Sequence, residues 1–416
     1  MGDRSLGFDP QLTQLPLVFD LPAVGALFEE RWPRLDPEGG IASVVARRVL
    51  DTKYQPLVSC VATYELDCKV EGGESRRTIG ALELGRSGPA LRLFDQDPRL
   101  PWIATATEVE EMRRRLAGLP GLAAGRGRPL EITPIRYKPG ARCVLRYKLA
   151  GGSDPELLFG KILAADSDRL ASSLAALAAA SSDAPHMPHI AGPVGHWPDL
   201  RMLVQRAVVG DELHDVAFDV ERDARARERW MGVAGSGLAG LHSETGVAGP
   251  RRTLTDDIDE LDGYRAPMEQ ADPELAGSYG RALELLRSRA GGEPELVCSH
   301  GAFRTDQFMI QDGELVMIDL DSFCWANPAR DVGNFLAYLQ WKAMRQPHYA
   351  AFIEAGTRSF LDGYAAVRRA PDEGWTRLYT AASLLKVAGR RFRSLTVKEW
   401  PRVPRLVEAA HTILAG

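Results

Sequence analysis

The residues best suited to chemistry lie in one stretch in the C-terminal third of the chain. A polar segment, Ser299–Gln307, is followed by an apolar run, an Asp312-Gly313 turn and a second apolar run that ends with Asp319 and Asp321. This order of loop, apolar run, glycine-bearing turn and apolar run predicts a β-hairpin that delivers polar side chains to one cleft.

The hairpin brings together the ligand types that Mg²⁺ prefers. Asp319 and Asp321 offer carboxylate oxygens, and Gln307 on the preceding loop offers an amide oxygen. Hard oxygen ligands of this kind suit a magnesium ion that bridges the phosphates of a nucleotide. A buried acid without a partner is costly, which makes Asp319 the strongest candidate. Asp321, two residues further along an extended strand, would share its face and act as a second ligand, or else cap the next turn.

Composition limits the classes of partner. The chain has 416 residues, a net charge of -5 and 45% hydrophobic residues, so it predicts a soluble protein of two or three lobes. It lacks the basic footprint of a nucleic-acid-binding protein, and we expect no nucleic acid as partner. Five scattered cysteines predict reduced thiols and a cytoplasmic protein. We expect no secretory signal and no membrane association, because no apolar run is long enough to cross a bilayer.

The elements upstream contain an internal repeat. Thr52–Leu66 and Ile135–Leu149 share Tyr, Pro, Cys, Val, Tyr and Leu at equal spacing, and a strand-like run follows each copy. Only the second run carries a lysine after its glycine, Lys161. The first copy is therefore expected to repeat the architecture without the chemistry.

The remaining elements follow from breakers and periodicity. Residues 1–30 read as an irregular arm broken by prolines, 201–213 as a buried strand leading into a loop, and 251–262 as an acidic connector. Helices are predicted at 107–116, 168–180, 233–243, 274–289, 332–343, 349–367 and 375–392.

The stretch at 299–331 resembles the catalytic and metal-binding loops of aminoglycoside phosphotransferases and related small-molecule kinases. Their pattern is His-Gly-Asp, four residues, Asn, then Ile-Asp, then Asp-Pro and a later Asp. His300-Gly301, Ile318-Asp319 and Asn327-Pro328 with Asp331 match it. The resemblance implies an α+β, protein-kinase-like bilobal fold, with a β-rich N-lobe, a helical C-lobe and an extra N-terminal lobe that repeats part of the N-lobe. The implied domains are 1–130, 131–210 and 211–416.

Two positions depart from that pattern. Ala302 stands where the family has its catalytic Asp, and Gln307 stands where it has a metal-binding Asn. The resemblance implies that His300 supports the loop, and that Asp331 anchors it through backbone amides. Arg304 would stabilise charge on the transferred phosphoryl group or pair with Asp306.

Asp306 is the nearest carboxylate to the vacancy at Ala302. It is either a substitute base or a turn-capping acid.

The resemblance also implies a nucleotide site in the second repeat copy. Gly140 and Arg142 lie in the turn expected to cover the phosphates, and Lys161 is the expected phosphate-binding lysine. Backbone groups from Gln205 to Ala207 would meet an adenine edge. The helix at 168–180 has no Glu to hold the lysine, so Asp168 or a residue elsewhere would serve.

Two functions remain open at this point. The first is transfer of phosphate from ATP, or another nucleoside triphosphate, with Mg²⁺, to a hydroxyl of a small-molecule acceptor. The second is a catalytically impaired pseudokinase that binds a nucleotide or metabolite as a sensor or partner module. Ala302 could also be a replacement made to trap a complex. The sequence does not fix the oligomeric state.

A basic cluster bears on the acceptor. Lys386, Arg390, Arg391 and Arg393 gather on a predicted helix and favour an anionic or neutral acceptor if that helix lines the cleft. Otherwise they form a solvated helix end.

Overall fold

The computed structural model describes residues 9–37, 40–70, 75–122, 129–150, 155–292, 295–395 and 397–416. These form two compact units. The first holds most of the chain up to residue 171, with residues 193–207 and 393–395, and the second holds residues 172–192, 208–392 and 397–416. The first unit is rich in strands and the second is largely helical.

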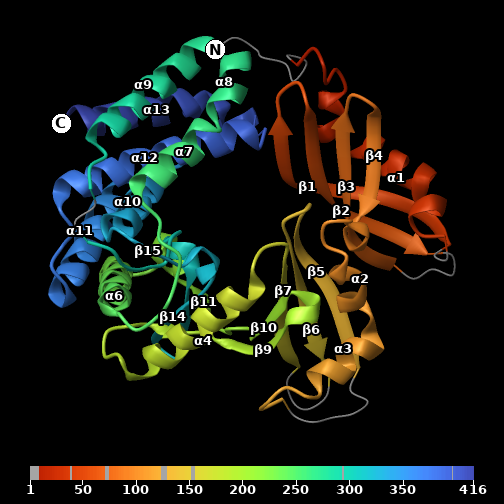
Figure 1. Ribbon diagram of the computed structural model, residues 1–416, viewed down its shortest axis with the longest axis horizontal. Helices are drawn as coiled ribbons and strands as arrows, with labels where there is room; N and C mark the ends of the chain where they lie inside the picture. The colour runs from red at the N-terminus through yellow and green to blue at the C-terminus, as the bar shows by residue number, and fades with distance from the viewer. Residues whose placement is uncertain are drawn as a thin grey trace. The chain divides into compact units, whose positions relative to one another are not determined.

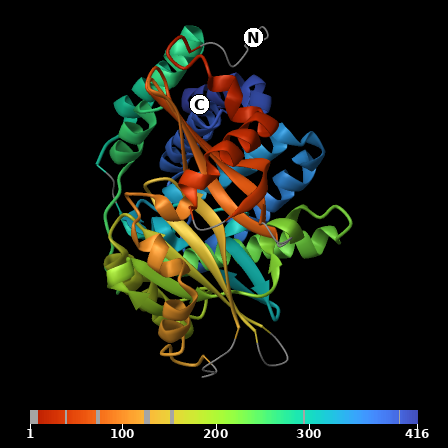
Figure 2. The ribbon, with the colours of Figure 1, turned by 90° about the vertical axis from the view of Figure 1, so that its right-hand side faces the viewer.

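The first unit begins with a helix packed on an antiparallel sheet. Strands β1 (Ile41–Gln55), β2 (Ser59–Val70), β3 (Ser75–Gly85) and β4 (Gly88–Leu93) pair in sequence order. Helix α1 (Leu21–Leu35) lies against β1 and β4, as Figures 1 and 2 show. The prediction of an irregular arm over residues 1–30 is therefore wrong from residue 21 onward. Pro22 lies in the first turn, where a missing N–H does no harm, and the Asp20 side chain caps the helix.

A second antiparallel sheet follows in the same unit. Its order is β5 (Leu130–Lys138), β6 (Arg142–Leu149), β7 (Glu156–Leu163), β10 (Met202–Arg206) and β9 (Pro193–Trp197). The short helices α2 (Trp102–Thr107) and α3 (Val109–Leu116) share its apolar core. Alternate residues of β6 are buried, as expected for a strand with one face on a core.

The two sheets repeat each other in side-chain detail. The hydroxyl of Tyr54 donates to Asp9 Oδ2 at 2.7 Å, and that of Tyr137 donates to Asp97 Oδ2 at 2.8 Å. Asp9 also accepts from the backbone N–H of Leu57, and Asp97 from that of Gly140, in the turn of each hairpin. Both turn residues have positive φ, 58° at Leu57 and 69° at Gly140.

Ten residues after each of these tyrosines, a second tyrosine repeats the pattern. Tyr64 donates to Val18 O at 2.9 Å, and Tyr147 donates to Ala106 O at 2.8 Å. The N-terminal lobe is thus a second copy of part of the N-lobe, which confirms the predicted repeat.

The second unit is built from helices around two small sheets. One sheet has the order β11 (Asp211–Glu212), β13 (Phe308–Gln311), β14 (Glu314–Met317) and β8 (His189–Ile190), and the other pairs β12 (Val297–Ser299) with β15 (Cys324–Ala326). The helices are α4 (Ser167–Asp183), which begins in the first unit, α5 (Leu213–Phe218), α6 (Ala224–Ser243), α7 (Leu254–Asp262), α8 (Arg265–Ala271), α9 (Pro273–Arg289), α10 (Ala329–Arg345), α11 (Ala350–Val367), α12 (Glu373–Arg393) and α13 (Val403–Ala415).

The segment predicted as an acidic connector contains helix α7. Thr253 and Asp256 form a capping box at its start, and Leu254, Ile258 and Leu261 bury one face in the core of the second unit. The density of acids concealed this apolar spacing.

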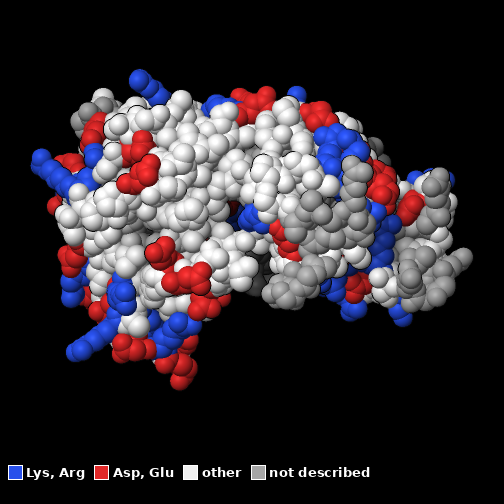
Figure 3. All heavy atoms as spheres, turned by 90° about the horizontal axis from the view of Figure 1, so that it is seen from below, with Lys and Arg blue, Asp and Glu red and all other residues white. Residues whose placement is uncertain are grey.

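All five cysteines are free and buried, and burial raises the pKa of Cys60 to about 12 and that of Cys68 to about 11. Within the described ranges, no helix combines the length and hydropathy needed to span a bilayer. On the face shown in Figure 3, basic and acidic side chains are interspersed.

Candidate functional site

The predicted hairpin forms from β13 and β14, with Phe308 paired to Met317. One step beyond this pair, Ile318 N donates to Gln307 O at 2.9 Å, which places the amide residue and Asp319 at the same end of the hairpin. Strand β14 stops at Met317, earlier than predicted. Asp319 has left-handed backbone angles, with φ at 58° and ψ at 43°.

Because β14 ends at Met317, Asp321 does not have the extended backbone that was predicted for it. Asp321 lies in a 3₁₀ turn, Leu320–Ser322, and not on an extended strand. The argument that it shares a strand face with Asp319 is therefore wrong. Its role as a metal ligand stays a prediction.

Gln307 carries an oxygen that the protein itself does not use. Its side chain is 3% exposed, and its Nε2 donates to Asp306 Oδ1 at 3.2 Å. Its Oε1 is buried and has no hydrogen-bond partner. A buried acceptor without a donor is costly, and a cation bound beside it would remove that cost. The residues at this end of the hairpin therefore fit a magnesium ion, with Gln307 and Asp319 as the oxygen donors.

The loop before the hairpin is held by Asp331, in the first turn of α10. Its two carboxylate oxygens accept from His300 N at 2.6 Å and from Gly301 N at 2.9 Å. Burial tends to raise the pKa of Asp331, but the hydrogen bond from His242 and nearby positive charge lower it overall. Asp331 therefore stays ionised while it accepts both amides.

His300 is fully buried and faces the hairpin. Its Nε2 donates to Ile318 O at 3.1 Å, and its Nδ1 has no partner. This geometry suits a residue that joins the loop to the end of the hairpin that bears Asp319.

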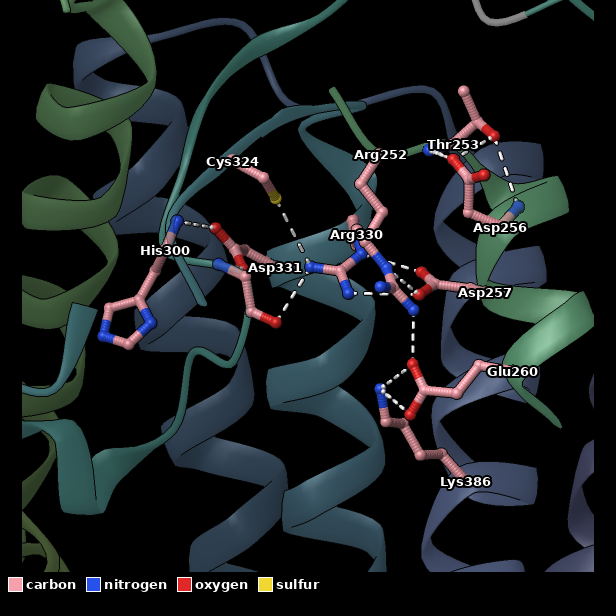
Figure 4. A network of polar contacts seen from close by, with 11 residues as sticks. Arg252, Thr253, Asp256, Asp257, Glu260, His300, Cys324, Arg330, Asp331 and Lys386 are labelled. Atoms are coloured by element: carbon pink, nitrogen blue, oxygen red, sulfur yellow. Dashed lines mark hydrogen bonds and ion pairs between the residues drawn. The ribbon is translucent and has the colours of Figure 1, made fainter. Parts of the chain in front are cut away.

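The neighbouring residue, Arg330, holds the same loop from its carbonyl side. Its Nη1 donates to Gly301 O at 2.8 Å, and its Nε and Nη2 donate to both oxygens of Asp257 on α7 at 2.7 and 3.1 Å (Figure 4). Arg252, Glu260 and Lys386 continue this network. Sequence reasoning missed Arg330 and the two acids. The available signals were the position of Arg330 next to Asp331 and the i, i+3 spacing of the acids on one helix.

Arg304 and Asp306 are paired with each other. Arg304 Nε donates to Asp306 Oδ1 at 2.9 Å, and the two side chains are 32% and 38% exposed. The guanidinium also lies over the ring of Tyr338, 5.8 Å from its centre. Their roles toward a phosphoryl group and as a base stay predictions.

A second polar cluster touches the loop and was not predicted. His214 on α5 lies 3.0 Å from Thr305 Oγ1 and 3.1 Å from the Tyr338 hydroxyl, while Lys342 Nζ lies 3.2 Å from its other ring nitrogen. Burial, together with the charge of Lys342, lowers the pKa of His214.

The cluster opens on a hollow of about 630 Å³ in the second unit. Its lining includes Phe218, Met309 and Tyr349 as well as four acids: Asp211, Glu212, Asp215 and Asp219. No sequence motif joins α5 to α10, so only the fold reveals the cluster and its hollow.

The expected nucleotide-binding residues lie in the first unit. Lys161 is half-buried on β7, opposite Val144 and Leu203 of the neighbouring strands. Asp168 contacts His196 at 3.2 Å. The approach of Lys161 to Asp319 stays a prediction, because the two belong to different units.

Two of the predicted backbone donors are already engaged. Gly140 N donates to Asp97 at 2.6 Å, and Ala207 N donates to Leu157 O at 2.9 Å. Arg142 opens β6 directly after the Gly140 turn, and Gln205 lies on β10 opposite Phe159. Contacts of the turn with phosphates and of this strand with adenine remain predictions. They would use groups other than those two N–H donors.

Comparisons with known proteins agree with this architecture. Similar solved structures include a choline kinase from Cryptosporidium parvum Iowa II, with a TM-score of 0.52 and 10% identity over 73% of this chain and 94% of that chain. An amicoumacin kinase in complex with AMP-PNP, Ca²⁺ and Ami has a TM-score of 0.52 and 13% identity over 74% and 94%. No protein of curated function matches significantly.

At such identities these structures establish the fold, which is kinase-like, as the sequence resemblance implied. The family model described as the phosphotransferase enzyme family matches residues 163–379, just over half of the 416 residues. The matched segment begins two residues after Lys161 and includes the loop, the hairpin and Asp331. The chain therefore belongs to the phosphotransferase enzyme family.

Proposed function

We propose that the protein transfers the γ-phosphoryl group of ATP, or of another nucleoside triphosphate, to a hydroxyl of a small-molecule acceptor, with Mg²⁺ as cofactor. Family membership supports this class of reaction. The observation that carries the proposal is the buried, unpartnered Oε1 of Gln307 at the end of the hairpin that bears Asp319. A similar fold holds AMP-PNP and Ca²⁺ in the amicoumacin kinase.

Each predicted residue then has a defined task. Gln307 and Asp319 hold the metal, with Asp321 as a further oxygen donor, and bound Mg²⁺ supplies neutralisation of charge on the phosphates. Lys161 is assigned to the phosphates from the N-lobe. Arg304 is assigned to the charge that develops on the transferred group.

The missing carboxylate at Ala302 lowers the rate without removing the reaction. Phosphoryl transfer depends mainly on positioning and on cationic groups, whereas general-base assistance contributes ~10²–10⁴-fold. Asp306, four residues after Ala302 in the chain, is assigned to take the hydroxyl proton. Its pairing with Arg304 would have to loosen when the acceptor binds.

The second candidate function is a pseudokinase that binds nucleotide and transfers nothing. Ala302 is the observation that favours it, because no side chain at that position can accept a proton. Nucleotide binding and turnover must therefore be measured separately.

The proposal is tested by calorimetric titration of the wild-type protein with ATP at several Mg²⁺ concentrations, together with an assay for ADP release in the presence of hydroxyl compounds. We expect Mg²⁺-dependent binding and acceptor-dependent ADP release. Gln307→Leu should weaken the Mg²⁺ dependence at least tenfold, since the amide oxygen is lost and an apolar side chain of similar volume takes its place. Gln311→Leu, on the same hairpin, is the matched control and should leave it unchanged.

The outcomes separate the two candidates. Binding without ADP release toward any hydroxyl acceptor would favour the pseudokinase. No binding of nucleotide at any Mg²⁺ concentration would sink both.

A further inference from the structure

Five charged side chains of the second unit form one chain of contacts that begins and ends with a cation (Figure 4). Lys386 Nζ lies 3.0 and 3.1 Å from the two oxygens of Glu260, and Glu260 also pairs with Arg252. Arg252 Nε donates to Asp257 Oδ1 at 2.7 Å, and Asp257 accepts from Arg330. The order is thus cation, anion, cation, anion, cation.

The first and last side chains of this series of contacts, Lys386 and Arg330, line the same cavity. The cavity measures about 30 Å³ and is lined by Lys386, Arg330, Asp257, Ser383, Asn334 and Gly301, with Leu261 and Ala382. Gly301 is the residue before Ala302 in the loop. The cavity therefore lies beside the position at which the related kinases carry their catalytic acid.

The charges around the cavity do not cancel. With Asp331, which accepts from Gly301 N and acts on Arg330, and with Arg390, which acts on Lys386, three carboxylates face four cations. Arg330 and Asp257 are 7% and 8% exposed, whereas the side chains of Lys386, Arg252 and Glu260 are 21%, 32% and 33% exposed. Burial lowers the pKa of Lys386, and Arg390 adds to this effect. A buried cation in excess is costly unless an anion compensates for it.

Donors are also in excess at the cavity. The ammonium group of Lys386 has three N–H donors, and the contacts with Glu260 involve only the two oxygens of that carboxylate. Ser383 adds a hydroxyl that can donate. One possible acceptor at the cavity is already engaged, because Gly301 O accepts from Arg330 at 2.8 Å.

The loop itself contributes no negative charge at this place, because residue 302 is alanine. An aspartate there would have repelled an anion bound beside Gly301. The absence of that carboxylate and the excess of cations thus favour the same kind of ligand.

We propose that the acceptor carries a carboxylate, which binds in this cavity between Lys386 and Arg330 and completes the ring of alternating charges. A cavity of 30 Å³ holds about two water-sized groups, which is the room that two carboxylate oxygens need. This inference rests on the proposed function, because it names the acceptor class of the same site. The hydroxyl to be phosphorylated would extend from the cavity past Gly301.

The test uses three compounds of nearly equal size that share one hydroxymethyl group: glycolate, ethylene glycol and ethanolamine. Binding to the full-length protein is followed by ligand-observed NMR, with and without Mg²⁺ and AMP-PNP. We expect glycolate to bind at least tenfold more tightly than the other two compounds. Lys386→Met should abolish this preference.

The variant suits the test because it leaves three cations, Arg252, Arg330 and Arg390, facing three carboxylates, Glu260, Asp257 and Asp331, so no carboxylate loses its last cationic neighbour. Lys386→Arg should keep the preference, and Lys148→Met, at a half-buried position of β6 in the first unit, is the control. Glycolate that binds no better than ethylene glycol, a preference for ethanolamine, or a preference that survives in Lys386→Met would each overturn the inference.

The readouts distinguish this inference from the proposed function. Selective glycolate binding by a protein that never binds nucleotide would retain the anion site and refute the kinase. Nucleotide binding and transfer to uncharged acceptors, with no effect of Lys386→Met, would retain the kinase and refute the carboxylate site.

Discussion

At the scale of single residues, Gly301 is the most constrained position of the loop. Asp331 and Arg330 together take its N–H and its carbonyl, as described for Figure 4. Its φ is 81°, and a Cβ atom there would lie 2.0 Å from Ser322 O. No other residue fits this conformation and this contact. The backbone leading into Ala302 is therefore held in one conformation. Any side chain introduced at position 302 would extend from a Cα atom whose position is fixed.

The fixed backbone makes Ala302→Asp informative. If the acceptor hydroxyl lies where related kinases place it, the new carboxylate should raise the rate of transfer by ~10²–10⁴-fold, because that is the usual contribution of a general base. Turnover is measured under saturating ATP and Mg²⁺.

Ala302→Asn has nearly the same shape and cannot act as a base, so it controls for packing. Equal rates for the two variants would show that position 302 does not face the acceptor. The proposed carboxylate site adds a condition: the gain should be larger for an uncharged acceptor than for an anionic one.

Asp319 illustrates a functional residue held in an unfavourable conformation. Its left-handed backbone, with φ at 58°, is unusual for any residue but glycine. Asp319→Gly should therefore leave the melting temperature unchanged or raised, while Mg²⁺-dependent nucleotide binding is lost. Asp319→Ala should lower the melting temperature by an amount that corresponds to ~1 kcal/mol and lose binding equally.

Calorimetry and nucleotide titration together check this prediction. If Asp319→Gly binds nucleotide with normal Mg²⁺ dependence, the carboxylate is not a metal ligand. The positive φ of Asp319 would then need another explanation.

At the scale of elements, α7 and α10 are joined by the Arg330–Asp257 pair. Burial opposes the charged form of Arg330, but the two hydrogen bonds to Asp257 raise its pKa overall. For Asp257 the signs are reversed. Burial raises its pKa, but Arg330 and Arg252 lower it by more, so the pKa is lowered overall. The pair therefore stays ionised and ties the loop at Gly301 to a helix distant in sequence.

A double-mutant cycle tests this connection. Arg330→Met and Asp257→Asn should each destabilise the protein by up to ~3–5 kcal/mol, because each removes a partner from a buried charge, and the loss should be smaller for Arg330→Met, in which Arg252 still donates to Asp257. The double variant should lose less than the sum of the two. The free energies come from urea unfolding followed by intrinsic tryptophan fluorescence, to which Trp325, Trp341, Trp375 and Trp400 of the second unit contribute.

Asp256→Asn is the neighbouring control, since Asp256 contacts only the cap residue Thr253 in the described hydrogen bonds. It should cost ~1 kcal/mol. Additive effects of Arg330→Met and Asp257→Asn would contradict the connection.

The elements also show what sequence could predict. Helices α4, α9, α10, α11 and α12 have apolar spacing long enough to identify, and the hairpin has an Asp-Gly turn, so these were predicted. Helix α7 was missed because its apolar residues are outnumbered by acids. The end of β14 was misplaced because local sequence does not show that Asp319 leaves the extended conformation.

The residues of the candidate site also fall into those that the sequence could identify and those that it could not. Residues within one continuous stretch, such as His300, Gln307 and Asp319, could be found from spacing. His214, Asp257 and Lys386 could not be assigned to the loop, because their contacts with it or with Arg330 depend on packing between helices far apart in the chain.

At the scale of the whole molecule, the duplicated sheet is the feature that most extends the kinase-like core. The sequence showed the repeat of tyrosines and prolines at equal spacing, but not why the tyrosines recur. The structure supplies the reason, since Tyr54 and Tyr137 each bond a buried aspartate that also holds the hairpin turn. Without the aspartate, the buried tyrosine hydroxyl and the turn N–H would both lose their acceptor.

Asp9 and Asp97 occupy equivalent places in the two copies of the repeat, so a variant of one can serve as the experimental control for a variant of the other. Asp9 and Asp97 are 0% and 2% exposed, and each accepts from a tyrosine and from a turn N–H. Asp9→Asn and Asp97→Asn should each lower stability by ~1–3 kcal/mol, because an amide cannot accept all of those hydrogen bonds. Only Asp97→Asn should also weaken nucleotide binding, by about tenfold, since only its turn, at Gly140, belongs to the copy that carries Lys161.

Melting temperatures and ATP titrations of the two variants, in the same buffer with Mg²⁺, provide the comparison. Equal losses of affinity would mean that the first copy is part of the nucleotide site, and that the repeat kept its chemistry as well as its architecture. Equal stability losses with unchanged affinity in both would mean that the Gly140 turn does not approach the phosphates. A loss of affinity confined to Asp97→Asn would assign nucleotide binding to the second copy, because the local structure removed in the two variants is the same.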